Sequence, residues 1–311
     1  MEKSIWKMAS VDCIVWNDGE KWCACVIDKF TDDLKNAKVL TNFFDEHDYG
    51  ILHFPNEEKI SYSVTISNDG NLLQIITRTS DHGSDMAQLA AANFPNEAEK
   101  NGLAPGAQII SMIVTDYGDQ GIVQPAAIKK ALMKCIEMKV DIVSFSIWGL
   151  ILDIETVKLV NEIVKEHNIL IFKGAGNFGP FYLTLNPIDV FVEDSIFVIG
   201  ALDTSETENI LFNTQSKKLS STVSHFSSRG PAFNGNYGID FVAPGIASIY
   251  SPCFERNQIY QGTSISTPIA AGSVACMLSG LKEKSNSYSH STIKEALCKS
   301  AILPWAWNYS N

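Results

Sequence analysis

Residues 169–180 read ILIFKGAGNFGP, a run of apolar residues that breaks into a glycine-rich turn. A short, nearly uninterrupted apolar run is typical of a strand that is buried on both faces of a parallel sheet. The turn after it carries Asn177. Because functional groups in open α/β sheets gather at the carboxyl ends of the strands, this stretch predicts both a fold class and a place for a site.

Similar apolar runs, separated by segments of helical period, occur on both sides of this stretch. Short apolar runs occupy 107–114, 140–147 and 195–202, and segments of helical period lie at 125–139 and 155–168. Apolar strands that alternate with amphipathic helices form a parallel sheet with helices on both faces. We therefore expect an α/β fold with a mostly parallel sheet, followed by a loop-rich stretch over 203–260.

The amino-terminal part has a different pattern. Two alternating runs, 11–28 and 61–78, each contain an Asp-Gly pair at their centre. Such a pair between alternating apolar residues is a strong signal for a β-hairpin. We expect a hairpin-rich part over residues 1–80 and the α/β domain over residues 81–311.

Composition excludes several classes of function. The chain has 311 residues, 45% of them hydrophobic, and a formal net charge of −11, which disfavours nucleic acid and anionic lipid as partners. Its seven cysteines show no metal-ligand spacing, so we expect no metal and no cofactor, and a reduced setting inside the cell. The start has no apolar signal region, and the longest near-apolar run, 142–152, is too short to cross a bilayer. We expect no membrane partner and a cytoplasmic location.

A second stretch, GTSISTPIAAG at 262–272, begins a segment with helical period and carries many hydroxyl groups. Ser264 or Ser266 at a helix start is a common N-cap. A serine at that position also lies beside free backbone N–H groups and the positive end of the helix dipole, where an oxyanion is stabilised. The stretch alone leaves the cap and the nucleophile open.

Two further stretches favour the nucleophile. The residues DHGSDMA at 81–87 place His82 where a loop enters a helix, followed by a glycine that permits close backbone approach. Acyl transfer by a serine needs a base within hydrogen-bond reach and a donor for the oxyanion. His82 and Asn177 supply these two groups, so the sequence predicts one catalytic edge with Ser264.

These motifs carry a resemblance to a known family. HGSDMA, AGN and GTSISTP occur in the order of the histidine, oxyanion and nucleophile motifs of the subtilisin-like serine peptidases (subtilases), and FSSRGP and VAPG fit the same family. Within it, the hairpins at 11–28 and 61–78 resemble a segment that the tripeptidyl-peptidase II branch inserts before its histidine motif.

The resemblance implies a subtilisin-like fold with a small β-rich insert region before the histidine motif. It also implies a serine peptidase that acts on peptides and releases tripeptides from free amino termini, in a cytosolic protein that forms oligomers with its own kind or with full-length homologues. By the same resemblance Ser264 is the nucleophile, His82 the general base and Asn177 the oxyanion donor. The substrate-binding positions implied are Ser144, Ser146, Trp148 and Gly149.

The chain departs from this pattern at several places. The family's aspartate motif, an apolar strand that ends in Asp-Thr/Ser-Gly, is not found, and we expect the chain to begin after it. Asp28 is a poor stand-in because Lys29 and Phe30 follow it. The two glutamates with which the tripeptidyl-peptidase branch holds a substrate amino terminus correspond to Val123 and Gly149.

Loss of the aspartate strand predicts a gap in the sheet with unpaired edges on both sides. Three hypotheses follow from these departures. The chain is an active peptidase, a non-catalytic relative that binds peptides or joins an assembly, or one part of a longer gene product.

Overall fold

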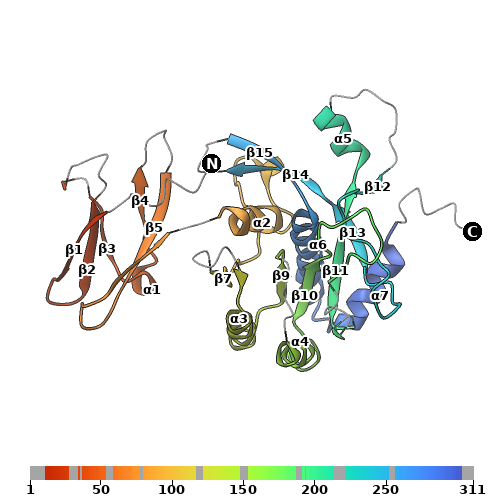
Figure 1. Ribbon diagram of the computed structural model, residues 1–311, viewed down its shortest axis with the longest axis horizontal. Coiled ribbons are helices and arrows are strands. Elements are labelled where there is room, and N and C mark those ends of the chain that lie inside the picture. Colours follow the sequence, from red (N-terminus) through yellow and green to blue (C-terminus); the bar gives the residue numbers. More distant parts are fainter. Residues whose placement is uncertain are drawn as a thin grey trace, which may run out of the picture. The chain divides into compact units, whose positions relative to one another are not determined.

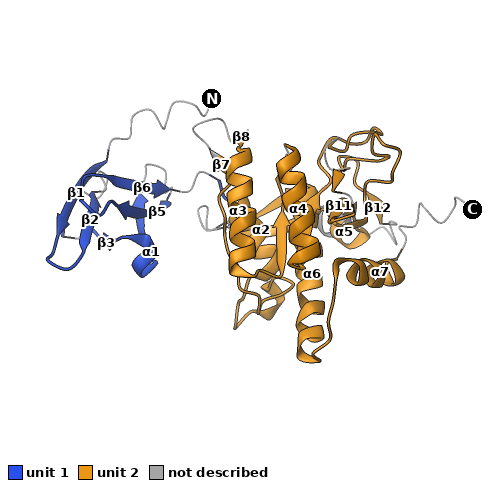
Figure 2. Ribbon diagram, turned by 90° about the horizontal axis from the view of Figure 1, so that it is seen from below, with its two compact units in different colours: residues 1–81, 251–256 blue, residues 82–250, 257–311 orange. Residues whose placement is uncertain are grey.

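The computed structural model describes residues 11–27, 34–35, 37–53, 59–77, 80–116, 122–147, 153–186, 191–192, 194–212, 221–251 and 256–302. Asp28, Trp148 and Gly149 lie outside these residues. The chain divides into two compact units, 1–81 with 251–256 and 82–250 with 257–311 (Figure 2).

The first unit consists of two antiparallel sheets and one short helix. One sheet has the order β1 (Asp12–Asn17), β2 (Trp22–Ile27) and β3 (Val39–Thr41), and the other has β4 (Gly50–His53), β5 (Lys59–Ile66) and β6 (Leu73–Thr77). The helix is α1 (Phe43–Glu46). The strand pairs β1–β2 and β5–β6 confirm the two predicted hairpins.

The second unit is built on a mostly parallel sheet (Figure 1). Strand β10 (Leu170–Gly174) pairs in parallel with β9 (Ile142–Phe145) on one side and with β11 (Ile196–Asp203) on the other. Strand β13 (Phe241–Pro244) continues β11 in parallel, and β12 (Thr222–Val223) pairs with it antiparallel. The carboxyl ends of β9 and β10 therefore meet at one edge of the sheet.

Helices cover both faces of this sheet. Helices α3 (Pro125–Met138) and α4 (Ile154–Glu166) bury one face, with Ile128 and Val160 against Ile171 of β10. Helices α6 (Thr263–Glu283) and α7 (His290–Ser300) bury the other, with Val274 and Ile293 in contact with the cluster around Phe172 and Phe197. The predicted α/β class is confirmed.

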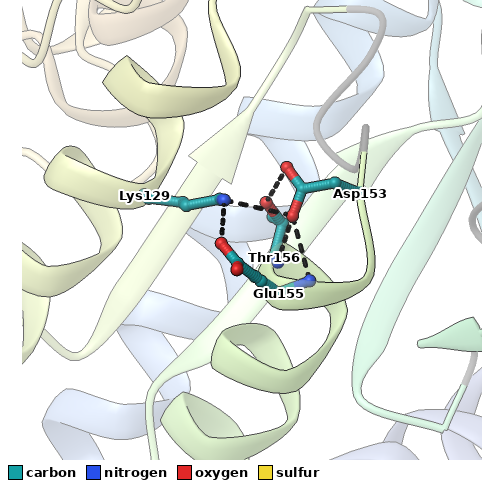
Figure 3. A network of polar contacts seen from close by, with 4 residues as sticks. All are labelled: Lys129, Asp153, Glu155 and Thr156. Atoms are coloured by element: carbon teal, nitrogen blue, oxygen red, sulfur yellow. Dashed lines mark hydrogen bonds and ion pairs between the residues drawn. The ribbon is translucent and has the colours of Figure 1, made fainter.

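The first turn of α4 is held by a polar network that reaches α3 (Figure 3). Asp153 is the N-cap, and its Oδ1 accepts from the backbone N–H groups of Glu155 at 2.9 Å and Thr156 at 3.0 Å. Lys129 of α3 lies 3.2 Å from Asp153 Oδ1 and 2.5 Å from Glu155 Oε2. The hydrogen bond from the Thr156 N–H is the main cause that lowers the pKa of Asp153, and Lys129 lowers it further.

The remaining elements of the second unit are shorter or lie at its periphery. They are α2 (His82–Ala91), the 3₁₀ turn Ala98–Lys100, β7 (Thr115–Asp116), β8 (Ile122–Val123), α5 (Ser205–Phe212), β14 (Ile246–Ser251) and β15 (Arg256–Gln261). Four strands and a helix thus occupy much of the 203–260 stretch, so the expectation of a loop-rich stretch there is wrong in part.

The predicted strand at 107–114 is also wrong. These residues form no sheet ladder, and the side chains of Ile109, Ile110 and Ile113 are 50%, 40% and 78% exposed. Within the residues that the structure describes, β9 pairs with β10 alone. A strand needs a neighbouring strand for its hydrogen bonds, and the other side of β9 has no such neighbour among the described residues. An apolar sequence by itself therefore does not produce a strand at 107–114.

Helix α6 is central to the second unit. By length and composition alone it is the one described helix that could cross a membrane, with a mean hydropathy of 1.4 over its most apolar window. It packs, however, against β9, β10, β11, β13 and α2. Its apolar residues are therefore accounted for by the core of this unit.

Candidate active site

The start of α6 has no side-chain cap. Gly262 occupies the N-cap position, and neither Ser264 nor Ser266 caps the helix. The N-cap interpretation of these serines is therefore wrong. The backbone N–H of Thr263 is instead bound by Asn177 Oδ1 at 2.8 Å, from the turn after β10.

Asn177 is held in one orientation by this contact. Its Oδ1 accepts from both the backbone N–H and the Oγ1 hydroxyl of Thr263, at 2.8 and 3.0 Å. A backbone N–H can only donate, so the atom facing Thr263 must be the carboxamide oxygen. The Nδ2 donors of this exposed side chain are thereby directed away from Thr263.

Gly262 leaves room for that amide. A Cβ at this position would lie 3.3 Å from Asn177 Nδ2, closer than ordinary van der Waals contact. Its φ of 155° adds backbone strain for any other residue. Glycine before the Thr-Ser pair therefore keeps the approach to Nδ2 open.

Ser264 is joined to the end of β9. Its Oγ donates to the backbone oxygen of Ser146 at 3.3 Å, and the Ser146 hydroxyl donates back to the backbone oxygen of Ser264 at 3.0 Å. The hydrogen bonds of the described residues use the N–H groups of Thr263 and Ile265 and leave the N–H of Ser264 without an acceptor. Ser264 thus lies between the ends of β9 and β10, at the positive end of the α6 dipole.

His82 is the first residue of α2, as the sequence predicts. Helix α2 packs on α6, and a Cβ on Gly272 of α6 would lie 3.1 Å from the backbone oxygen of Ala90. Ala90 and Gly272 each come eight residues after the predicted catalytic residue of their helix. At a rise of 1.5 Å per residue, His82 and Ser264 both lie about 12 Å along their axes from this crossing.

Partial burial lowers the pKa of His82 from its usual value, although its side chain keeps contact with solvent. The imidazole is therefore neutral and able to accept a proton at neutral pH. This is the state that a general base requires.

The other hydroxyl groups at the start of α6 have structural partners. Ser266 is fully buried and donates to the backbone oxygen of Pro244 at 3.1 Å, which agrees with the packing role expected for it. Thr267 donates to the backbone oxygen of Thr263 at 2.8 Å. The hydroxyl-rich sequence thus serves both to dock the helix and to orient the site.

One residue of the site, Thr263, was not predicted from the sequence. Its side chain is 2% exposed, and its Oγ1 accepts from the N–H of Gly176 at 3.1 Å while it donates to Asn177. The excess of hydroxyl groups in 262–272 was the available signal. It did not point to Thr263, because the partner of Thr263 is a turn far away in the sequence.

The predicted substrate-binding residues are only partly described. Ser144 lies on β9 with an exposed side chain, and Ser146 is the residue bonded to Ser264. Trp148 and Gly149 lie outside the described residues. Val123, which the sequence analysis places at one of the family's glutamate positions, packs against the apolar cluster under α3 and α4. Among the described residues no group of three His, Cys, Asp or Glu side chains is placed to hold a metal.

Comparison with known proteins identifies the family of the chain. The model of the subtilase family, peptidase S8, matches residues 19–309, and the chain therefore belongs to this family of serine peptidases. The described fold is the α/β fold of that family.

Within the family the chain is similar to tripeptidyl-peptidase 2. It is 35% identical to that protein of Caenorhabditis elegans over 305 residues, covering 96% of this chain and 22% of the relative. It is 31% identical to that of Arabidopsis thaliana, covering 92% and 21%. A crystal structure of tripeptidyl peptidase 2 matches with a TM-score of 0.67 and 26% identity, covering 92% of this chain and 22% of that one. The chain thus spans about a fifth of the length of these relatives.

Sphericase shares the fold alone, with a TM-score of 0.55 at 23% identity over 71% of this chain and 69% of its own.

Proposed function

We propose that this chain is the peptidase part of a serine peptidase resembling tripeptidyl-peptidase 2, with Ser264 as nucleophile. The observation that carries the proposal is the fixed orientation of Asn177, whose Oδ1 is held by Thr263 so that Nδ2 is left to donate. Together with the Ser264 N–H, this gives two donors for one oxyanion.

The reaction would proceed by acyl transfer. The Ser264 Oγ attacks the carbonyl carbon of a peptide bond while the His82 imidazole takes the hydroxyl proton. Asn177 Nδ2 and the Ser264 N–H bind the oxyanion of the tetrahedral intermediate. The imidazolium then protonates the leaving amine, the acyl-enzyme ester remains on Ser264, and water activated by His82 releases the carboxylic acid.

The same proposal covers the substrate and the setting. Peptides are the substrates that the likeness to tripeptidyl-peptidase 2 supports, with tripeptide release from free amino termini as the finer expectation. Ser144, Ser146, Trp148 and Gly149 would border the bound peptide, residues 1–80 would form an insert region and residues 81–311 the peptidase domain. A cytoplasmic location and association with full-length homologues belong to the proposal as well.

The rate expected from these residues is low. Without the aspartate that orients the histidine, a subtilase loses roughly 10⁴-fold in kcat, a value measured on subtilisin itself. That loss corresponds to about 5.4 kcal/mol of transition-state stabilisation. A covalent probe of the nucleophile is therefore a better test than turnover.

The test is the reaction of the full chain with a fluorophosphonate probe, followed by mass spectrometry of the labelled peptide. We expect the label on Ser264, its loss in Ser264→Ala and a slower reaction in His82→Ala. Ser273→Ala is the control, because Ser273 lies exposed on the same helix with its hydroxyl bonded to the backbone oxygen of Ile269.

The proposal is wrong if Ser264 stays unlabelled both in this chain and in a longer one that carries the family's aspartate strand ahead of residue 1. That outcome would favour the non-catalytic relative, in which the same edge binds peptides without cleaving them.

A further inference from the structure

A cavity of about 300 Å³ lies on the second unit, at the opposite edge of the sheet from the candidate active site. Its lining includes Asp141 and Ile169, the residues directly before β9 and β10. They mark the amino ends of these strands, whereas Ser264 and Asn177 lie at the carboxyl ends. The length of the strands therefore separates this cavity from the nucleophile, and we call it the distal cavity.

Helices α3 and α4 both end at the distal cavity. Ile136, Lys139 and Val140 line it from the end of α3, and Glu166 and His167 line it from the end of α4. The backbone hydrogen bonds of the described residues leave the backbone oxygen of Glu166 without a donor. The carboxyl end of a helix carries about half an elementary negative charge, so the two ends together supply about one.

The lining combines apolar groups with an aromatic residue that is held in place. Val140 and Ile169 are the apolar part, and Ile169 is 1% exposed. The half-buried Tyr288 also lines the cavity, and its backbone oxygen accepts from Asn168 Nδ2 at 2.8 Å. The Tyr288 hydroxyl donates to Asp141 Oδ1 at 3.2 Å. A phenol ring fixed beside a carboxylate is an environment that suits a cation.

The charged side chains around the distal cavity offset one another. Lys282 Nζ lies 2.5 Å from Asp141 Oδ1, and both side chains are about half-exposed. Glu166 and Lys139 add one charge of each sign to the lining. The negative charge of the two helix ends is therefore not cancelled by these four side chains. The distal cavity thus favours a cation over an anion.

We propose that the distal cavity binds an organic cation, a guanidinium or ammonium group on a short apolar stem. The stem packs on Val140 and Ile169, and the cationic group donates to the carboxylate of Glu166 and to its backbone oxygen. A guanidinium or ammonium group has several N–H donors and no acceptor, which matches a lining rich in oxygen atoms. Two sources share this chemistry: a free small molecule and an arginine or lysine side chain of another protein.

The experiment measures the binding of butylguanidinium to the full chain by isothermal titration calorimetry. Butylurea is the matched control ligand, because it has nearly the same shape and no charge. A second pair of ligands is a blocked peptide of Gly and Ala with one central Arg and the same peptide with citrulline in its place. We expect each cation to bind more tightly than its neutral counterpart. The tighter of the two cations then assigns the source, the peptide indicating a protein side chain and butylguanidinium a free small molecule.

Three substitutions of exposed residues place the cation. Glu166→Gln should weaken butylguanidinium binding roughly threefold, as expected for the loss of one exposed charge contact. Lys139→Gln should strengthen it by a similar factor, because a competing positive charge is removed. Glu162→Gln is the control, since Glu162 lies exposed one turn earlier on α4 and does not line the cavity. We expect this control to bind butylguanidinium like the native chain.

Three outcomes would overturn the inference. The first is equal binding of butylguanidinium and butylurea. The second is an equal loss of affinity in Glu166→Gln and Glu162→Gln, which would show that the cation responds only to the net charge of the chain. The third is an affinity that none of the three substitutions changes, which would place the cation elsewhere. The inference does not depend on the proposed function, because the distal cavity shares no residue with the catalytic edge.

Discussion

At the scale of single residues, the main feature is the coupling of Thr263 to Asn177. One buried hydroxyl accepts from the N–H of Gly176 and donates to the Asn177 carboxamide, so the turn after β10 and the start of α6 are fixed to each other. The nucleophile and the oxyanion donor come from segments far apart in the sequence. Their relative position therefore depends on this contact.

Replacing Thr263 tests the coupling. Thr263→Val keeps the shape of the side chain but leaves the Gly176 N–H without its acceptor and Asn177 with one donor fewer. We expect the rate constant for fluorophosphonate inactivation to fall roughly tenfold, because an unsatisfied buried group costs about 1–3 kcal/mol. The affinity for the probe should stay near that of the native chain. Thr263→Ser retains the hydroxyl and should restore most of the rate, and equal rates in the two variants would contradict the assignment.

The pKa of His82 gives a second prediction at this scale. Burial lowers the pKa of this imidazole from its usual 6.5, so the base remains neutral to a lower pH. We expect the rate of Ser264 labelling to lose half its value at a pH below 6.5, as the imidazole takes up a proton. Labelling rates measured over a pH series, with Ser264→Ala as background, test this. A midpoint at neutral pH or above would count against His82 as the base.

At the scale of elements, α2 and α6, which carry the predicted catalytic residues near their starts, cross in close contact. Gly272 permits it, since a Cβ there would meet the Ala90 backbone oxygen and the Leu103 Cβ, each at 3.1 Å. Gly280 lies in the same helix with nothing within 4 Å of its would-be Cβ. The two glycines thus form a matched pair, one in the contact and one outside it.

We expect Gly272→Leu to lower the free energy of unfolding by about 1–3 kcal/mol, because the new side chain forces the two helices apart. It should also reduce the labelling of Ser264 by shifting α2 and His82. Gly280→Leu should leave labelling unchanged and keep or raise the stability, since glycine is a weak helix former. Urea unfolding of both variants decides the point, and equal stabilities would show that the crossing tolerates a wider separation.

Helix α7 carries a group that makes stability depend on pH. His290 is 8% exposed and packs against Phe197 with the two rings tilted by 39° and 4.4 Å between their centroids. Desolvation, followed by the charge of Lys294, lowers its pKa from 6.5 to about 4, although a bond to the Ile196 backbone and the charge of Asp194 act in the opposite direction. The unfolded chain therefore binds a proton more readily than the folded chain between these two pH values.

It follows that the free energy of unfolding decreases as the pH falls from 6.5 toward 4, by roughly 3 kcal/mol in full. His290→Phe should remove this part of the pH dependence. His167→Gln, which takes an exposed imidazole from the end of α4, is the control and should retain the slope. Urea denaturation at several pH values provides the measurement, and a native-like slope in His290→Phe would assign the effect to other groups.

The elements that the sequence predicted correctly are those with a strong local period. The hairpins, the helices α3 and α4 and the strands β9, β10 and β11 all follow from the spacing of their apolar residues. The segment 107–114 has an equally apolar sequence, but a strand needs a neighbouring strand, and no local pattern reports whether that neighbour exists. The role of Thr263 was missed for a similar reason, since its partner becomes visible only after folding.

At the scale of the whole molecule, the main feature is that β9 has a strand on one side only among the described residues. Ile109, Ile110 and Ile113 are exposed, and within the described residues β9 has a partner on one side only. An open strand edge and exposed apolar side chains each favour association with another chain. The net charge of −11 opposes this association through repulsion between copies.

Ile109→Lys together with Ile113→Lys should weaken such self-association without lowering the free energy of unfolding, because both side chains are already in contact with water. Salt should strengthen association of the native chain by screening the repulsion. Sedimentation velocity over a series of concentrations and salt levels tests this. A native chain that stays monomeric at high salt would contradict the prediction.

The unmatched side of β9 also bears on how this polypeptide reaches its folded state. The unpaired backbone N–H and C=O groups on this side of β9 can form hydrogen bonds with an extended segment, including one that emerges from the same ribosome. A strand of the same polypeptide that pairs there during synthesis would block pairing with another chain. The order in which segments are synthesised would then decide whether this side of the sheet is covered by the same polypeptide or left open to another chain.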